Sequence, residues 1–375
     1  MSIRRSPNAS GGRRPSMLDV ARMAGVSHQT VSRVINGSPD VAPETRARVR
    51  KAIDTLGYQP NNTARALASH RTRTIAVVAG GLWRPRSVDM LAAASATARA
   101  HALFTTVSLV DADLCTDADM VGLCDDFSQQ GVDALVVLAP TDVMVRAVCR
   151  LDTPLPRVIV TSTHGQASLR DMMSSMREES RRRSAVVGGD DWGAMAQVVR
   201  LVIGYGHRSA LYFAGPRGWR GSTTRLLAWR TLTAEVSLPN VVVPGNSWDA
   251  GEAYARMNHA LERIGSSGGA VPTVVVTSSD GQAMGAARAL HEHGLRIPQD
   301  VSLVGFGDYP AMAAMMPPLS TLRPDFAQIG SAALREAVWL LGGGPEVGYA
   351  ASVHGAGLIP ATMVRRASLG RVPRV

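Results

Sequence analysis

The sequence predicts a small all-α unit of the helix-turn-helix type, followed by an α/β core of two lobes, each built on a parallel sheet. Two observations favour this fold class. Short helical patterns separated by glycine fill residues 16–57, whereas short apolar runs alternate with helical patterns from residue 74 onward. Such alternation is typical of parallel sheets covered by helices, and its length of about 300 residues indicates two sheets.

The composition is that of a globular protein with enough apolar material for several compact units. Of its 375 residues, 45% are hydrophobic and 19% are charged. The chain contains no apolar run of about 18 residues, so we expect no membrane span. The basic N-terminal segment lacks the apolar stretch of a secretory signal, and we therefore expect a cytoplasmic protein.

Charge and cysteine usage favour a nucleic-acid partner and disfavour a metal site. The formal net charge of +10 favours binding to polyanions, with nucleic acid as the first candidate, although an arginine excess is also typical of GC-rich genomes. The three cysteines, Cys115, Cys124 and Cys149, have no CxxC spacing. We expect reduced thiols, no disulfide, no metal and no cofactor.

The first helix is predicted over MLDVARMAG, residues 17–25, where apolar residues recur at helical spacing. Ser16 precedes it and is suited to cap its N-terminus. Gly25 is suited to end it, because glycine adopts the positive φ of a helix C-terminus without strain. The glycine also begins the tight turn that leads to a second helix.

The second helix is predicted to start after Ser27, which can cap it, and to end at Asn36 and Gly37. Its inward stripe consists of β-branched residues at i, i+3 and i+4: Val31, Val34 and Ile35. Two short helices joined by a tight turn are typical of a helix-turn-helix, whose second helix enters the major groove of DNA.

The outward face of the second helix carries residue types suited to DNA. Gln29 and Arg33, four residues apart, can pair with adenine and guanine edges respectively. Thr30 and Ser32 flank them and suit phosphates, and His28 projects from the helix tip. The pattern predicts a helix that reads double-stranded DNA; the alternative is a solvated face of a small helical bundle.

A third helix is predicted over 43–56, with Pro43 at its first position and Gly57 after its end. The segment YQPNNTARALASHRTRT, residues 58–74, can then form a short helix. That helix is too short to be stable alone, so we expect it to form only against a partner, as a hinge would.

The segment LDVARMAGVSHQTVSRVINGSPDVAPETRARVRKAIDTLGYQPNNTARALA resembles the DNA-binding head and hinge of the LacI family of bacterial transcription repressors. The resemblance implies that His28 and Gln29 read bases and that Leu67 is wedged into the central base step, which kinks the duplex. The implied DNA-contacting set is Ser27, His28, Gln29, Thr30, Ser32, Arg33, Asn36, Asn61, Ala64 and Leu67. Ala42 departs from the Ser or Thr cap of many relatives, at a cost of ~0.5–2 kcal/mol in helix stability.

The rest of the chain alternates between strand and helix patterns. We expect strands at 74–80, 104–111, 133–140, 156–162, 209–215, 240–245, 272–278 and 301–307. We expect helices at about 87–101, 118–130, 142–150, 191–204, 222–236, 249–264 and 280–293. This half resembles the periplasmic-binding-protein-like core of the same family.

The resemblance implies that the chain crosses three times between the lobes. We place the crossings near 162–186, 307–320 and 342–350, so that a strand at 319–323 and a helix at 325–341 return to the first lobe. In such folds small ligands bind in the cleft, beyond the carboxyl ends of the strands.

Six polar or aromatic side chains near strand ends are candidates for binding an effector: Asp142, Arg225, Trp248, Ser279, Asp280 and Asp308. Asp and Arg can hold adjacent hydroxyls, and a Trp face can stack on a sugar ring. Asp280 either touches the ligand or caps the helix that it begins. The resemblance implies an amide at Ser279 and an Asp at Gly307 in sugar-binding relatives, so a less polar ligand, an anion gripped by Arg225, or no ligand stays open.

The predicted domains are a disordered basic tail over 1–15, a helix-turn-helix domain over 16–59, a hinge helix and linker over 60–72, a two-lobed effector-binding and dimerisation domain over 73–364, and a flexible tail over 365–375. The run at 163–184 is longer than the usual connection in the family. We expect its arginines to be solvated, with a partner site as the alternative.

The resemblance implies a repressor that binds a palindromic operator as a homodimer, because one helix reads only a few base pairs. A small-molecule effector in the cleft, a sugar or related metabolite, would release the DNA. A regulator controlled by a protein partner or by no effector, and a cytoplasmic ligand-binding protein, are the alternatives. We expect no enzyme, because the chain has no GxSxG, P-loop or GxGxxG motif.

Overall fold

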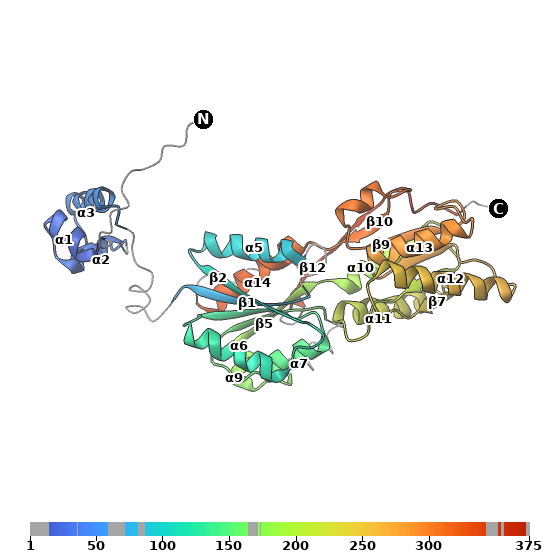
Figure 1. The fold of residues 1–375 in the computed structure, drawn as a ribbon, viewed down its shortest axis with the longest axis horizontal. Helices are drawn as coiled ribbons and strands as arrows, with labels where there is room; N and C mark the ends of the chain where they lie inside the picture. Colours follow the sequence, from blue (N-terminus) through green and yellow to red (C-terminus); the bar gives the residue numbers. More distant parts are fainter. Residues whose placement is uncertain are drawn as a thin grey trace, which may run out of the picture. The chain divides into compact units, whose positions relative to one another are not determined.

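The computed structural model describes residues 15–35, 37–58, 72–81, 87–163, 172, 174–342, 352–353 and 356–372. The chain divides into two compact units, Met1–Thr72 and Arg73–Val375, which we call the head and the core (Figure 1). Within the described ranges, no helix is long and apolar enough to cross a membrane. The same ranges contain no group of His, Cys, Asp or Glu side chains that could hold a metal ion.

The described part of the head contains three short helices around one apolar cluster: α1 Met17–Ala24, α2 His28–Ile35 and α3 Pro43–Leu56. The cluster contains Val20, Ala21, Ala24, Val31, Val34, Val41, Val49, Ala52 and Tyr58. None of the three helices is long enough to be stable by itself, so burial of this shared cluster holds them together.

The ends of the head helices have the caps that local sequence predicts. The Ser16 side chain accepts a hydrogen bond from the Asp19 backbone, and the Asp19 carboxylate accepts one from the Ser16 backbone at 2.8 Å, which forms a capping box. Gly25 adopts the left-handed conformation at φ 63°, as predicted. Ser27 accepts a hydrogen bond from the Thr30 backbone at 3.2 Å, whereas Ala42 provides no side-chain cap for α3.

The core contains two sheets, one in each lobe. The first sheet has the strand order β11-β12-β5-β4-β3-β1-β2, from Ser352–Val353, Ala356–Ile359, Ser184–Gly189, Arg157–Val160, Ala134–Leu138, Thr74–Gly80 and Phe104–Val110. The second has the order β13-β10-β9-β8-β6-β7, from Thr362–Val364, Ser320–Arg323, Ser302–Phe306, Val274–Thr277, Ala210–Phe213 and Asn240–Val243. The pairs β11–β12 and β10–β13 are antiparallel and the other pairs are parallel.

Helices cover both faces of each sheet (Figure 1). In the first lobe, α5 Ser87–Ala100 and α14 Phe326–Leu340 pack on one face, and α6 Asp117–Gln129 and α7 Asp142–Arg150 on the other. In the second lobe, α10 Asp191–Gly204 and α11 Arg220–Glu235 share one face, and α12 Ala250–Ser266 and α13 Asp280–Glu292 the other. The described residues of the core also form two short helices, α9 Glu178–Arg182 and η1 Pro310–Ala314.

The structure corrects the predicted crossings between the lobes. The chain leaves the first sheet after β5 and enters α10 at 190, returns between β10 and α14 at 324–325, and leaves again between β12 and β13 at 360–361. All three positions lie later in the chain than expected. The strand predicted at 319–323 is β10, which pairs with β9 in the second lobe, so its assignment to the first lobe was wrong. The helix that follows it, α14, packs in the first lobe as predicted.

The error arose because β5, β12 and β13 were not recognised as strands. The β5 sequence SAVVGG has one apolar pair between small residues, and it follows directly on an arginine cluster. It becomes a strand because β4 and β12 supply parallel partners on its two sides, with Val158 opposite Ala185 and Val187 opposite Gly357. Pairing of this kind depends on residues far away in the chain and leaves a weak local pattern.

Candidate functional site

The first candidate site is the outward face of α2 in the head. Ser27, His28, Gln29 and Arg33 are exposed, and Thr30 is half-buried beside them. The Ser27 and Thr30 hydroxyls lie 2.9 Å apart, so the cap residue is held against the first turn of the helix. Val31 and Val34 on the opposite face are buried in the head cluster and orient the polar face outward.

Of the five other predicted DNA-contacting positions, one lies within the described residues and four lie outside them. Ser32 is half-buried on α2. Asn36 lies outside the described residues, as do all three predicted hinge residues, Asn61, Ala64 and Leu67. The DNA-contacting role of the whole set stays a prediction.

The third helix of the head carries exposed positive charge. Arg48, Arg50 and Lys51 on α3 are exposed, while Arg46 donates a hydrogen bond to the Ser38 carbonyl at 2.6 Å and so ties α3 to the end of α2. Exposed cations on a DNA-binding domain are suited to hold phosphates, while side chains of the recognition helix contact base edges.

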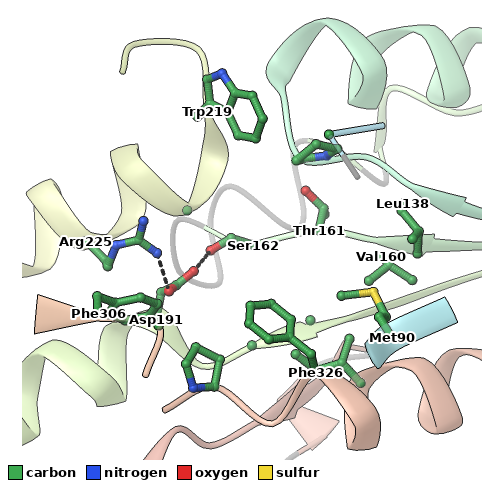
Figure 2. Close-up of a pocket in the computed structure, with 18 of the residues that line it drawn as sticks. Met90, Leu138, Val160, Thr161, Ser162, Asp191, Trp219, Arg225, Phe306 and Phe326 are labelled. Atoms are coloured by element: carbon green, nitrogen blue, oxygen red, sulfur yellow. Dashed lines mark hydrogen bonds and ion pairs between the residues drawn. The ribbon is translucent and has the colours of Figure 1, made fainter. Parts of the chain in front are cut away.

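The second candidate site is a cavity of about 150 Å³ between the lobes of the core. The first lobe contributes residues at the carboxyl ends of its strands, including Gly80, Pro140, Thr161 and Gly189, together with Met90 and Phe326 from helices. The second lobe contributes Asp191, Trp219, Arg225, Phe306, Gly307 and Tyr309. Figure 2 shows the apolar side chains of Leu138, Val160, Met90 and Phe326 grouped on one side of this space.

One polar cluster lies on the wall of this cavity, built from Ser162, Asp191 and Arg225 (Figure 2). Arg225 Nη1 donates to Asp191 Oδ1 at 2.8 Å, and the Ser162 hydroxyl donates to Asp191 Oδ2 at 2.6 Å. The guanidinium lies over the Phe306 ring at 4.1 Å and near the Trp248 ring at 5.6 Å. The ion pair is deeply buried, with side-chain exposures of 4% for Arg225 and 11% for Asp191, so the two charges neutralise each other away from water.

Of the six predicted effector residues, Arg225 lies on the cavity wall, whereas the other five have other surroundings. Asp142 pairs with Arg220 at 2.9 Å and lines a separate cavity of about 230 Å³ that also contains Cys149 and Met172. Trp248 is not part of the cavity wall; its ring meets that of Trp219 edge-to-face, with 5.9 Å between the ring centroids.

Asp308 and Asp280 are held by partners within the second lobe. Asp308 pairs with Arg323 at 2.5 Å and Arg366 at 2.7 Å; burial alone would raise its pKa, but hydrogen bonds from these two arginines lower it. Asp280 accepts hydrogen bonds from the Thr321 hydroxyl at 2.6 Å and the Tyr309 backbone at 2.9 Å. Burial raises the pKa of Asp280 to about 6, against these hydrogen bonds.

The cap of α13 is Ser279, not Asp280 as one reading of the sequence had it. Ser279 accepts a hydrogen bond from the Gln282 backbone at 3.1 Å and is buried. Gly307 does lie on the cavity wall, with φ 136°, a conformation that strains any other residue. A Cβ at this position would lie only 2.8 Å from Tyr309 Cε1. The surrounding structure therefore leaves no room for the Asp that the resemblance implied here.

Sequence reasoning missed Ser162, Asp191, Trp219, Phe306 and Phe326 on the cavity wall. Asp191 follows β5 by one residue, so the rule that places ligand residues after strand ends would have found it if β5 had been recognised. Phe306 is the last residue of β9 and so also fits this rule, whereas Trp219 and Phe326 lie at helix starts and do not.

A three-helix head with a polar second helix, joined to a two-lobed core with a cavity between the lobes, defines the class of ligand-responsive DNA-binding regulators. Residues 16–61 match the profile of "Bacterial regulatory proteins, lacI family", and residues 199–369 match that of a "Periplasmic binding protein-like domain". The chain is 30% identical over 319 residues to the HTH-type transcriptional regulator CelR of Thermobifida fusca, covering 83% of this chain and 87% of that protein. It belongs to the LacI family of bacterial transcription regulators.

Other relatives agree with this assignment. The Lactose operon repressor of Escherichia coli (strain K12) is 26% identical over 358 residues, covering 94% of this chain and 89% of that protein. Its solved structure, a dimer bound to operator and the anti-inducer ONPF, superposes with a TM-score of 0.75 at 25% identity, covering 95% of this chain and 99% of that one. These relatives are regulators of transcription and not enzymes.

Proposed function

We propose that this chain represses transcription in the cytoplasm, binding an inverted-repeat operator as a homodimer and leaving it when a small molecule occupies the cavity between the lobes. The observation that carries the proposal is the α2 face, where His28, Gln29 and Arg33 are exposed on a helix whose other face is buried. The Lac repressor structure, bound to operator as a dimer, supports it by similarity.

Exposed apolar residues on the first lobe support self-association. Val88 on α5 is 62% exposed, and Phe104, Val107 and Leu109 on β2 are 52%, 46% and 66% exposed. The strand β2 is at the edge of its sheet. Exposed apolar residues on an edge strand favour association with another chain. A second copy of this chain is the partner that a palindromic operator requires.

The position of the cavity supports the effector part of the proposal. Its wall takes residues from both lobes, so a bound molecule stabilises the arrangement in which the lobes are close together. Coupling between such a site and DNA binding usually amounts to ~1–3 kcal/mol. We propose a helix-turn-helix domain over 16–59, a hinge helix and linker over 60–72, and an effector-binding and dimerisation domain over 73–364. The hinge connects the other two domains along the chain, and we propose that it transmits this coupling.

Selection from a pool of random DNA duplexes by the immobilised full chain tests the DNA-binding part. We expect enrichment of one inverted repeat with two half-sites that are about one helical turn apart, as two symmetry-related helices require. The variant Gln29→Ala should lose the enrichment at specific positions, whereas Thr55→Ala, an exposed change on α3, should keep it. Enrichment of single, unpaired half-sites would argue against the dimer.

A further inference from the structure

We propose that the molecule which fills the cavity between the lobes is a single neutral ring, largely apolar, with a hydroxyl or carbonyl group at one end, rather than a polyhydroxylated sugar. Cyclic and aromatic alcohols and ketones belong to this class. The inference rests on the proposed function, since it names the effector of the same site. Four features of the cavity carry it: its size, its wall, its charge balance and two buried polar groups.

The size of the cavity fits one ring. Its volume is about 150 Å³. An apolar cavity of about this size holds benzene, whereas drug-sized ligands occupy about 300–1,000 Å³. The cavity is therefore closer in size to a site for one ring than to a site for a drug-sized ligand.

The wall of the cavity is mainly hydrocarbon. Its large side chains include Met90, Leu138, Val160, Trp219, Phe306 and Phe326. A hexose would bring a hydroxyl on nearly every ring carbon against this surface. Burying a hydroxyl without a hydrogen-bond partner is unfavourable, whereas an apolar ring gains from leaving water.

The polar cluster on the wall is electrically balanced. Arg225 pairs with Asp191, and Ser162 donates to the second oxygen of the same carboxylate. A ligand carboxylate would add a second buried anion to a single buried cation. Because a buried charge without a counter-ion is costly, the balance favours a neutral ligand.

Two buried groups on the wall have no hydrogen-bond partner within the described ranges. They are Arg225 Nη2 and Thr161 Oγ1. Arg225 Nη2 can only donate, and the Thr161 hydroxyl can donate or accept. Both can therefore be satisfied by the oxygen of a hydroxyl or carbonyl group, which places the polar end of the ligand on this side of the cavity.

Three probes with the same six-membered ring separate the possibilities. Cyclohexanol is neutral with one hydroxyl, cyclohexanecarboxylate is an anion, and myo-inositol has a hydroxyl on every carbon. We expect the full chain to bind cyclohexanol at least ~10-fold more tightly than either of the others by calorimetry, with a rise in melting temperature. Thr161→Val, which keeps the shape but removes the hydroxyl, should weaken cyclohexanol binding.

Two variants of α14 serve as a matched pair. Phe326→Ala removes an aromatic ring from the wall and should weaken cyclohexanol binding by at least ~10-fold. Trp339→Ala removes a ring from the same helix at a position that is 42% exposed and off the wall, and it should leave binding unchanged. Equal losses in the two variants would overturn the proposal.

The outcomes separate this proposal from the proposed function. Tighter binding of myo-inositol, or of cyclohexanecarboxylate, would overturn the ligand class and leave the effector role standing. Binding of no probe would overturn the ligand class as well. Measured in parallel, retained binding to the selected inverted repeat would then show that the DNA-binding function holds without it.

Discussion

The carboxylate of Asp142 and the guanidinium of Arg220 lie 2.9 Å apart and join the two lobes of the core. Three further contacts surround this ion pair. Asp142 N donates to the Gly218 carbonyl at 2.8 Å, Arg220 Nε donates to the Ser162 carbonyl at 2.9 Å, and Thr141 and Trp219 form an antiparallel bridge. The pair thus lies at the point where the start of α7 meets the start of α11, off the wall of the cavity that both lobes enclose.

The first prediction concerns this ion pair. Asp142→Asn should lower the free energy of unfolding of the core by about 1–2 kcal/mol, because it removes a charge-assisted hydrogen bond from Arg220, which is only 7% exposed. All six tryptophans follow residue 73, so tryptophan fluorescence during urea denaturation reports on the core.

The matched control for this change is Asp117→Asn, which breaks an exposed ion pair with Arg150 inside the first lobe. Surface pairs of that kind contribute about 0–1 kcal/mol, so the control should change stability little. If Asp117→Asn lowers the free energy of unfolding as much as Asp142→Asn does, the ion pair between the lobes stabilises the core no more than an exposed pair.

The second prediction concerns Asp280, which is fully buried and has a pKa raised to about 6 by desolvation. A carboxyl with a raised pKa binds its proton more tightly when folded, so its contribution to stability is largest below the unfolded value of about 4 and is lost as the pH rises through 6. The stability difference between the native chain and Asp280→Asn should therefore shrink by roughly 2–3 kcal/mol between pH 4 and pH 7.

Asp300 provides the comparison for this pH dependence. Hydrogen bonds from Arg296 lower its pKa to about 2, so its contribution to stability is lost only as the pH falls below about 4. The stability difference between the native chain and Asp300→Asn should stay constant from pH 4 to pH 7. If the Asp280→Asn difference is equally constant, burial does not raise the Asp280 pKa.

The third prediction separates base contacts from phosphate contacts in the head. Arg33→Ala should relax specificity at one base pair of each half-site, a change of about 1–3 kcal/mol, with little effect on the salt slope. Arg50→Ala, an exposed change on α3, should weaken binding to all sequences and reduce the salt slope by about 1. Binding isotherms at several salt concentrations on matched and mismatched duplexes measure both, and identical effects of the two changes would contradict the assignment.

Local and distant interactions explain what the sequence could and could not predict. The head was predictable because its caps and apolar spacing are local, as Ser16 and Gly25 illustrate. The cavity was predictable only in position. Asp142 and Asp191 both follow a strand closely, and only the docking of the lobes decides that Asp191 contacts Arg225 on the cavity wall while Asp142 contacts Arg220 away from it.

The fourth prediction concerns self-association. Leu109→Asp places a charge on the outer face of β2, where the leucine is 66% exposed, and it should raise the dimer dissociation constant by at least ~100-fold. Met316→Asp, at a side chain that is 93% exposed in the second lobe, should leave the dimer intact. Sedimentation of the full chain over a range of concentrations measures the dissociation constant of both variants. An unchanged dissociation constant in Leu109→Asp would show that β2 is not part of the dimer interface.

The fifth prediction concerns Gly307 on the cavity wall. Its φ of 136° is strained for any other residue, and a Cβ would lie 2.8 Å from Tyr309 Cε1 and 3.2 Å from Asp280 Oδ2. Gly307→Ala should therefore lower the free energy of unfolding by about 1–3 kcal/mol.

Gly307→Asp should lower the free energy of unfolding further above pH 6, because a second carboxylate then faces the ionised Asp280. This additional destabilisation should fade as Asp280 takes up its proton below pH 6. Urea denaturation of the two variants at pH 5 and pH 8 measures the strain and the repulsion separately. If both variants lower the free energy of unfolding equally at both pH values, backbone strain and steric overlap account for the whole effect. Repulsion from Asp280 would then contribute nothing to the preference for glycine at this position.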